Sequence, residues 1–442
     1  MINLFDNFDQ GSQDLYQSLI FSGYDNQTVV INDNGFLPKN IISPYAFFAG
    51  YYSNQTTKAK SFYQIRVPKF WEIRGNNNYA EIFDGDQKRG KINYFSPLAY
   101  HRIVETVEWF DRDGVIRLVD SYNCFGLRFA ETVCDKTGKA ILKSYFNQFG
   151  KEIIVENFQT GDIILSNSEK VEIFKSKTEF LLYFFKKNSL SVDRIFYNSL
   201  STPMLVSYKL QERGEDILFW NERIKDKIPG NMQVILNDSK QRTKKVVFQN
   251  YYDYQRFQKE YRGAGLEKVK YLSMLYRYQE KNDAKANALL LTNSDQLEQF
   301  EKLVKALPEM HFSVASLTEM SDKLMKFSGF KNVQLYPNIQ KNLLNRLFSR
   351  SNYYFDINHG NQILSAVRNA FINQQLIMSF TNTCHAPLYV SDDLVYDPNR
   401  ADLMIRRIKQ IISDKNILYK ELSQQKNHLV RSTPEDYRRI LQ

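Results

Sequence analysis

The sequence predicts an α/β protein of two doubly wound domains that face a cleft, with an antiparallel β-meander inserted in the first domain. Two patterns predict this fold class. Short apolar runs alternate with stretches of helical periodicity near both ends of the chain, and glycines recur every twelve residues between them. Strands joined by helices pair in parallel, whereas strands joined by tight turns pair antiparallel.

The composition is that of a globular protein with two or three domains. The chain has 442 residues, 43% of them hydrophobic, and its three cysteines follow no C-x-x-C spacing. We therefore expect no disulfide framework, no metal site and no cofactor. The N-terminus lacks a basic segment followed by an apolar one, and no apolar run reaches about 18 residues. We expect a cytoplasmic protein that does not span a membrane.

The net charge is basic. Lysine and arginine exceed aspartate and glutamate by 59 − 49 = 10, which fits an acidic partner such as nucleic acid, an anionic membrane or a nucleotide sugar. The basic residues are spread among acids along the chain, and no nucleic-acid-binding motif appears. A solvated basic surface is the favoured interpretation, and no nucleic-acid partner is expected.

Residues 1–60 and 209–284 are predicted to form the first doubly wound domain. Alternating apolar runs and helical stretches indicate its strands, which are expected at 2–5, 28–31, 216–220 and 244–249.

Two places in this domain carry candidate site residues. Gly11 and Ser12 open a helix after the first strand, where backbone N–H groups can hold a polar ligand. Helix capping by Ser12 or a neighbour is the alternative. Trp220 and Glu222 lie at a later strand end, where Glu222 is a candidate acid, base or hydrogen-bond acceptor and a structural role is the alternative.

The inserted domain, residues 61–208, contains a repeat. An Asp or Asn followed three positions later by Gly recurs at Asp111, Asn123, Asp135 and Asn147. The Asp or Asn side chain can bond the turn backbone while the glycine takes a positive φ, so each unit is one strand and one turn. Consecutive hairpins of this kind make an antiparallel meander.

The meander has aromatic residues near its predicted turns, at Tyr122, Phe125, Tyr145 and Phe158. Such an extended sheet suits docking of a partner chain or peptide. The alternative is a self-contained β-domain covered by its own helix at 178–187.

Residues 285–400 are predicted to form the second doubly wound domain with a parallel sheet. Its strands are expected at 287–293, 311–316, 332–337, 353–358 and 376–382. The helices between them are expected to start near Ser294, Leu317, Ile339 and Asn361.

The turn after strand 353–358 is the central candidate site. In open α/β sheets ligands bind beyond the carboxyl ends of the strands, so this turn should face the cleft. Asn358, His359, Gly360 and Asn361 suit hydrogen bonding rather than acid chemistry. No acid lies near His359 in the sequence, which makes it a poor candidate for a catalytic base.

The tail, residues 401–442, is predicted to be helical and to pack back across the domains. An apolar stripe is formed by Leu403, Ile408, Ile411 and Leu418. Basic residues on the other face, namely Arg406, Arg407 and Lys409, are interpreted as solvated, with an anionic membrane surface as the alternative.

Three segments of this chain resemble the GtfB family: INLFDNFDQGSQDLYQSL, DILFWNE followed by IPGNMQVILN, and YYFDINHGNQIL. The resemblance covers the whole chain and implies the GT-B architecture of nucleotide-sugar glycosyltransferases, with an inserted meander. It also implies a role, because GtfB is the stabilising subunit of a two-protein O-linked N-acetylglucosaminyltransferase. That enzyme modifies serine-rich-repeat adhesins of Gram-positive bacteria before accessory Sec export.

Catalytic relatives imply residues that are missing here. They place an Arg and a Lys after the first strand of the second domain, which would stabilise the leaving diphosphate. The corresponding stretch, 291–298, has no cation, and its Asp295 and Glu298 would repel a diphosphate. Two glutamates that grip the donor in those relatives fall on Ile357 and Ser365 when Ala366 is placed on the alanine of their pattern.

We therefore expect a non-catalytic subunit that binds the acceptor and stabilises a GtfA-like catalytic glycosyltransferase. Its acceptor would be a Ser/Thr-rich adhesin polypeptide, and peripheral association with the inner face of the cell membrane is included in the expectation. The alternative is an active retaining GT-B glycosyltransferase with a divergent nucleotide-sugar site that uses Glu222 or His359. The candidate acceptor residues are Gly11, Ser12, Trp220, Glu222, Asn358, His359, Gly360 and Asn361.

Overall fold

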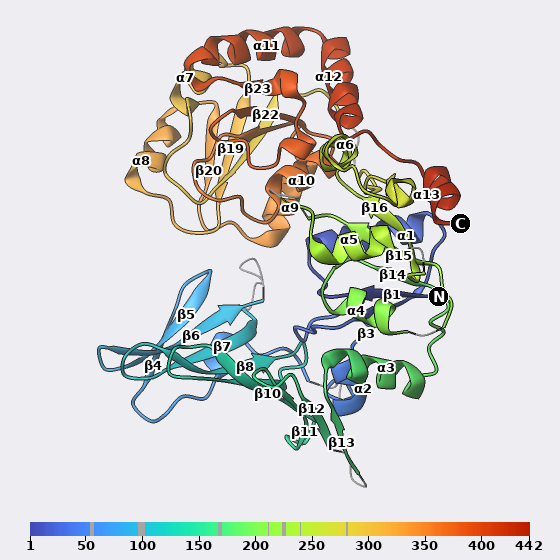
Figure 1. Cartoon of the computed structure of the whole chain (residues 1–442). Coiled ribbons are helices and arrows are strands. Elements are labelled where there is room, and N and C mark those ends of the chain that lie inside the picture. The colour runs from blue at the N-terminus through green and yellow to red at the C-terminus, as the bar shows by residue number, and fades with distance from the viewer. Residues whose placement is uncertain are drawn as a thin grey trace. The chain divides into compact units, whose positions relative to one another are not determined.

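The computed structural model describes residues 1–53, 57–95, 102–166, 170–210, 212–222, 227–238, 240–279 and 282–442. The described chain divides into two compact units (Figure 1). The first holds the residues up to Leu275 together with Ser432–Gln442, and the second holds Tyr276–Arg431.

The first unit contains a seven-stranded parallel sheet in the order β17-β16-β15-β14-β1-β2-β3. Every neighbouring pair in it is parallel, as predicted. The strands are β1 (Ile2–Phe5), β2 (Gln27–Val30), β3 (Ile41–Ile42), β14 (Ile195–Tyr197), β15 (Asp216–Trp220), β16 (Thr243–Phe248) and β17 (Val269–Tyr271).

Strand β14 pairs directly with β1 although the sequence analysis places it inside the insert. All three of its residues are buried in the core of this sheet. The chain therefore returns from the meander into the middle of the parallel sheet before residue 209. The reversal of strand order lies between β1 and β14, because β1 leads on to β2 and β14 leads on to β15.

Helices connect these strands and close the unit. They are α1 (Gln10–Phe21), α2 (Pro44–Ala49), α3 (Lys177–Lys187), α4 (Thr202–Lys209), α5 (Gly230–Asn237), α6 (Tyr251–Glu260) and α13 (Pro434–Leu441). The last helix contacts α1, and the buried Tyr437 hydroxyl donates to the carbonyl of Ser273 at 2.9 Å.

The predicted meander is a ten-stranded antiparallel sheet in which each strand pairs with its neighbours in sequence (Figure 1). Its strands are β4 (Glu72–Gly75), β5 (Tyr79–Asp84), β6 (Gln87–Tyr94), β7 (Val104–Phe110), β8 (Ile116–Tyr122), β9 (Arg128–Cys134), β10 (Ala140–Phe146), β11 (Glu152–Asn157), β12 (Ile163–Ser166) and β13 (Val171–Phe174). The repeat behaves as expected, since Gly114, Gly126, Gly138 and Gly150 have φ between +75° and +83°.

One face of the meander is covered by the unit's own helices. Phe180 of α3 packs with Tyr145, Ile154 and Leu165 of the sheet, while Phe184 of the same helix lies in the core of the parallel sheet. This confirms the covering helix of the alternative interpretation.

Burial corrects part of the docking prediction. Tyr145 lies in the cluster covered by α3, and Tyr122 lies in a separate core cluster of the meander. Their exposures are 4% and 7%, so neither ring can dock a partner. Phe158 is exposed.

The second unit contains a six-stranded parallel sheet in the order β20-β19-β18-β21-β22-β23. The strands are β18 (Asn287–Thr292), β19 (His311–Ser316), β20 (Val333–Tyr336), β21 (Tyr353–Asp356), β22 (Leu376–Phe380) and β23 (Val395–Tyr396). The helices are α7 (Phe300–Ala306), α8 (Asp322–Met325), α9 (Lys341–Arg350), α10 (Ala366–Ile372), α11 (Ala401–Ser413) and α12 (Lys415–His428).

All four helices begin later than predicted. The expected starts at Ser294, Leu317 and Asn361 are wrong, because α7 begins at Phe300, α8 at Asp322 and α10 at Ala366. The start expected near Ile339 is nearly right, since α9 begins at Lys341. Before α7 and α10 the residues between strand and helix form bends and turns instead, and Leu297 forms an antiparallel bridge with Asn358. This pairing between two loops cannot be seen in local periodicity.

The tail helices keep the predicted apolar stripe, with one change. Ile408, Ile411 and Leu418 are buried, but Met404 rather than Leu403 completes the buried set. Arg407 is not a solvated charge, because it pairs with the buried Glu421. No helix in the described parts of the chain has both the length and the apolar character needed to cross a membrane.

Candidate functional site

Three loops meet at the carboxyl ends of neighbouring strands in the second unit. They follow β18, β21 and β22, and cover residues 293–299, 357–365 and 381–386. The first two are joined by the Leu297–Asn358 bridge and by the Glu298 N–H, which donates to the carbonyl of Ile357 at 2.8 Å. We call these three segments the second-sheet loops.

Asn358 holds the second-sheet loops together. Its buried amide nitrogen donates to Asn293 Oδ1 and to the Gly360 carbonyl, both at 3.1 Å. Its amide oxygen accepts from the Thr292 hydroxyl at 2.8 Å and from the Gly360 N–H at 3.1 Å. Asn358 was predicted to contact acceptor, but its hydrogen-bonding groups are used inside the protein. Its role is to position its neighbours.

Glycine is required at position 360 because the loop after β18 lies very close to its Cα atom. A Cβ atom at this position would lie 2.0 Å from Asn293 Oδ1 and 3.2 Å from the Ser294 Cβ atom. A side chain at this position would displace the Asn293 amide, which accepts from Asn358. Asn361, the next residue, is exposed.

His359 has an acidic partner that the sequence analysis did not find. Its Nε2 lies 2.8 Å from Glu298 Oε2, and Asn382 Nδ2 donates to the same oxygen at 2.8 Å. Burial raises the pKa of the Glu298 carboxyl, but the hydrogen bonds from Asn382 and His359 outweigh it, so that the pKa is lowered overall. The sequence analysis considered only acids close to His359 in the sequence, and the partner is 61 positions away.

A second histidine, His385, links the end of β21 to the turn. Its Nδ1 lies 2.6 Å from Asp356 Oδ1, and its Nε2 lies 2.7 Å from the carbonyl oxygen of Gly360. Both partners are acceptors, so only the doubly protonated imidazolium can donate to both. The hydrogen bond that His385 donates to Asp356 raises the pKa of His385 above its ordinary 6.5, although burial opposes it.

The stability that His385 contributes should therefore fall as the pH rises. A histidine whose pKa is raised on folding contributes fully below its unfolded pKa, about 6.5, and loses that contribution as the pH passes its folded pKa. We expect His385→Gln to reduce the free energy of unfolding more at about pH 6 than at about pH 9. The matched control is His311→Gln, at an exposed position that should cost less than about 0.5 kcal/mol. An equal cost of His385→Gln at both pH values would contradict the charged bridge.

The second-sheet loops contain no lysine or arginine. Their two histidines are each paired with a carboxylate. At the positions that correspond to the donor-binding glutamates, Ile357 is fully buried in the core and Ser365 precedes α10 with φ +49°. These loops offer amides, hydroxyls and paired carboxylates, and they lack the cations that a diphosphate leaving group needs.

The first unit has its own polar cluster at the carboxyl end of β1. Asp6 accepts from Asn32 Nδ2 at 2.9 Å and from the Ser201 hydroxyl at 2.6 Å. Asn198, which follows β14, accepts from the Asp6 N–H at 3.2 Å and donates to Ser12 Oγ at 2.8 Å. We call Asp6, Ser12, Asn32, Asn198 and Ser201 the first-sheet cluster. It lies where the strand order reverses, which is where ligands bind in such sheets.

The predicted residues of the first unit fall into two groups. Gly11 and Ser12 lie in the first turn of α1, where Asp9 caps the helix by accepting from the Ser12 N–H at 2.8 Å. A Cβ atom on Gly11 would lie 3.1 Å from Asn221 Nδ2, so the end of β15 reaches this cluster. Glu222 is exposed beside it, whereas Trp220 is 3% exposed and belongs to the core. Trp220 was thus wrongly placed among the accessible residues.

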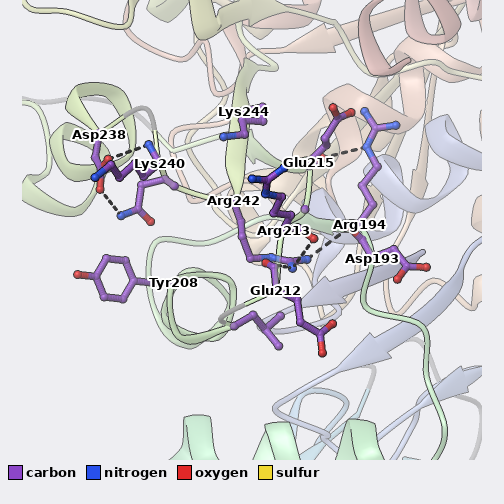
Figure 2. Close-up of a pocket in the computed structure, with 13 residues that line it drawn as sticks. Asp193, Arg194, Tyr208, Glu212, Arg213, Glu215, Asp238, Lys240, Arg242 and Lys244 are labelled. Atoms are coloured by element: carbon purple, nitrogen blue, oxygen red, sulfur yellow. Dashed lines mark hydrogen bonds between the residues drawn. The ribbon is translucent and has the colours of Figure 1, made fainter.

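A pocket of about 930 Å³ lies at the opposite end of the same sheet (Figure 2). Arg194, Glu215 and Arg242, which line it, come just before or at the amino ends of β14, β15 and β16. The Arg242 side chain at its floor is buried against Asp216. This pocket contains none of the predicted site residues.

Family models match most of the chain. They describe a GtfB N-terminal domain at 2–48, a GtfB middle domain at 71–175, a GtfB third domain at 177–259 and a GftB/GlyA-F C-terminal domain at 288–425.

Known proteins are similar over the full length. The UDP-N-acetylglucosamine--peptide N-acetylglucosaminyltransferase stabilizing protein GtfB of Streptococcus agalactiae is 44% identical over 100% of this chain and 99% of that protein. The protein of the same name from Streptococcus gordonii is 41% identical over 90% of this chain and 89% of its own length. A chain in the crystal structure of a GtfA/B complex bound to UDP and GlcNAc is 38% identical and superposes with a TM-score of 0.94, covering 100% of this chain and 99% of that one.

Proposed function

This chain belongs to the GtfB family, and from that premise we propose that it is the non-catalytic subunit of a protein O-linked N-acetylglucosaminyltransferase. In this role it stabilises a GtfA-like catalytic partner and binds the polypeptide acceptor. The observation that carries the proposal is its full-length similarity to stabilising proteins of that name. The absence of lysine and arginine from the second-sheet loops supports it independently.

The acceptor would be a Ser/Thr-rich adhesin polypeptide that is glycosylated before accessory Sec export. Such a chain is polar and disordered, so it is bound through hydrogen bonds rather than apolar pockets. The exposed groups available for this are Glu222 in the first unit and His359 and Asn361 in the second unit. Gly11, in the first turn of α1, is half-buried. Asn358 and Gly360 shape the turn that carries His359 and Asn361, and Ser12 accepts from Asn198 within the first-sheet cluster.

The histidine–carboxylate pair supports one alternative, an active glycosyltransferase with a divergent donor site. Glu298 orients His359 as it would orient a general base. Against this alternative, the second-sheet loops provide no cation for the charge that builds on a departing diphosphate. We therefore retain the non-catalytic assignment.

Location and domain division are also proposals. We propose a cytoplasmic protein with peripheral association with the cell membrane. The proposed domains are a two-segment Rossmann-like domain, an inserted meander that begins at 61, a second Rossmann-like domain at 285–400 and helices at 401–442. The second segment of the first domain, predicted at 209–284, begins before β14 instead, because that strand pairs with β1.

Calorimetric titration tests the non-catalytic assignment. The chain alone should show no binding of UDP-N-acetylglucosamine at micromolar concentrations and no UDP release with a Ser/Thr-rich peptide. Addition of the catalytic partner should produce UDP. Micromolar donor binding by the chain alone would overturn the assignment.

Peptide affinity tests the acceptor residues. Asn361→Ala or Glu222→Ala should each weaken peptide binding about 3- to 10-fold, because each removes one solvent-accessible hydrogen-bonding group. Asn345→Ala, at an exposed position on α9, is the matched control and should leave peptide affinity unchanged. Peptide affinity that is unaffected by both site variants would contradict the acceptor assignment.

A further inference from the structure

A second pocket, of about 320 Å³, lies in the second unit between α11, α12 and β23. Tyr396, Arg406, Arg407, Lys420, Glu421 and Gln424 are among its lining residues. It shares no residue with the second-sheet loops. Its volume is at the lower end of the range for small-molecule sites.

The pocket contains a buried carboxylate that is only half satisfied. The Glu421 side chain is 2% exposed, and its Oε1 accepts from the Arg407 guanidinium. Its Oε2 is buried and has no hydrogen-bond partner among the described residues. An unsatisfied buried oxygen of a charged group is costly, so this atom requires a donor.

The rim of the pocket carries cations. Arg406 and Lys420 are exposed, and neither forms an ion pair with a described residue. The charges of Arg407 and Glu421 cancel. Of the remaining charged lining residues, Arg406 and Lys420 are positive and Asp393 is negative, so the lining carries one net positive charge. Burial raises the pKa of Tyr396 to about 12, which keeps its hydroxyl protonated as an additional donor.

These features together select the ligand. A simple anion such as phosphate would be attracted by the cations at the rim, but it offers few hydrogen-bond donors to Glu421 Oε2. A simple cation would satisfy Glu421 but would be repelled by Arg406, Arg407 and Lys420. A suitable ligand has both an anionic group and a hydroxyl donor.

We propose that this pocket binds a phosphate ester of a small polyol. The phosphate lies between Arg406 and Lys420, and a polyol hydroxyl donates to Glu421 Oε2. The same chemistry occurs in a free polyol phosphate and in the headgroup of a phosphoglycerol lipid, and the experiment distinguishes these two sources.

The test uses the full chain with three probes: glycerol 3-phosphate, inorganic phosphate, and phosphatidylglycerol vesicles compared with phosphatidylcholine vesicles. We expect Arg406→Ala and Lys420→Ala to weaken binding of glycerol 3-phosphate or of phosphatidylglycerol vesicles by at least about 10-fold. Lys409→Ala, on the exposed face of the same helix but outside the pocket lining, should change it less than about 2-fold. Binding to vesicles but not to free glycerol 3-phosphate would identify the lipid as the source.

Glu421→Gln separates hydroxyl recognition from phosphate recognition. Wild type should bind the polyol phosphate, either free glycerol 3-phosphate or phosphatidylglycerol vesicles, more tightly than inorganic phosphate. Glu421→Gln should remove that difference. The rim variants keep the proposal testable if Glu421→Gln does not fold. Three results would overturn the proposal. They are no binding of any probe, equal losses in Lys409→Ala and Arg406→Ala, or inorganic phosphate binding as tightly as both glycerol 3-phosphate and phosphatidylglycerol vesicles.

Discussion

Replacing Arg242 by methionine is expected to lower the stability of the parallel sheet in the first unit by about 3–5 kcal/mol. The Arg242 side chain is 5% exposed and donates to Asp216 at 2.9 and 3.1 Å. It also donates to the carbonyls of Glu212 and Val192, at 2.7 and 2.5 Å. Methionine fills similar space but leaves the fully buried Asp216 carboxylate without its cation.

Asp216 of β15 forms hydrogen bonds with β14 and with α4. The loss of stability in Arg242→Met should therefore extend beyond β15. Its carboxylate accepts from the Ile195 N–H of β14 at 2.8 Å and from the Ser207 hydroxyl of α4 at 2.6 Å. These two bonds are too few to compensate a buried negative charge. We expect β14, β15 and β16 to loosen together.

Hydrogen exchange measured on peptides from β14, β15 and β16 is the appropriate measurement, because a chain of two units need not unfold in one step. The matched control is Arg213→Met, at an exposed position in the same pocket lining. It should cost less than about 0.5 kcal/mol. Equal protection of these strands in Arg242→Met and wild type would show that the pair does not support the sheet.

The meander and the parallel sheets were predictable because their signals are local. Asn123 and Gly126 show how: the Asn123 side chain accepts from the N–H groups of Phe125 and Leu127, both at 3.0 Å, while Gly126 takes φ +75°. Each turn is therefore specified by four consecutive residues, and the sequence repeats it at constant spacing. Periodicity of this kind predicts topology without knowledge of distant contacts.

Strand β14 was missed because it has only three residues, too few for a periodic signal. Its assignment depends on pairing with β1, 193 positions earlier, as in Ile2 with Ile195. Because β14 was not predicted, Asn198 and Ser201, which follow it, were not recognised as members of the first-sheet cluster. Asp6 could have been found, because it directly follows the first predicted strand.

The position of the candidate turn after β21 was predictable from the sequence, but the contacts of its side chains were not. Its position at the end of β21 was predicted from strand and helix periodicity. Which of its side chains face solvent was not, because that depends on partners in other loops. The side-chain amide of Asn358 forms hydrogen bonds with Thr292 and Asn293, and Glu298 pairs with His359. His385, which holds the turn from the loop after β22, was not predicted at all.

Partner binding should depend on the open end of the meander. Strand β13 ends the ten-stranded sheet, so one of its edges has no neighbouring strand in the described chain. Its Val171 and Ile173 are 60% and 59% exposed. Ile173 is in register with Ile164, which is in register with Val155, and these side chains lie on the face opposite the covered Ile154 and Leu165. An apolar row that ends at an unpaired strand edge is a surface to which another chain can add.

The double variant Val171→Glu with Ile173→Glu is therefore expected to weaken binding to the catalytic partner by about 100-fold or more. Both side chains are mostly solvated in the chain alone, so its own stability should change by less than about 1 kcal/mol. The affinity can be measured by surface-immobilised binding of the purified partner, with circular dichroism to verify folding. Val234→Glu, at a 41% exposed position on α5, tests whether any exposed valine would give the same result. Equal partner affinity in wild type and in the double variant would show that the partner does not bind at β13. A loss of affinity in the double variant but not in Val234→Glu would place the contact with the partner at the β13 edge of the meander.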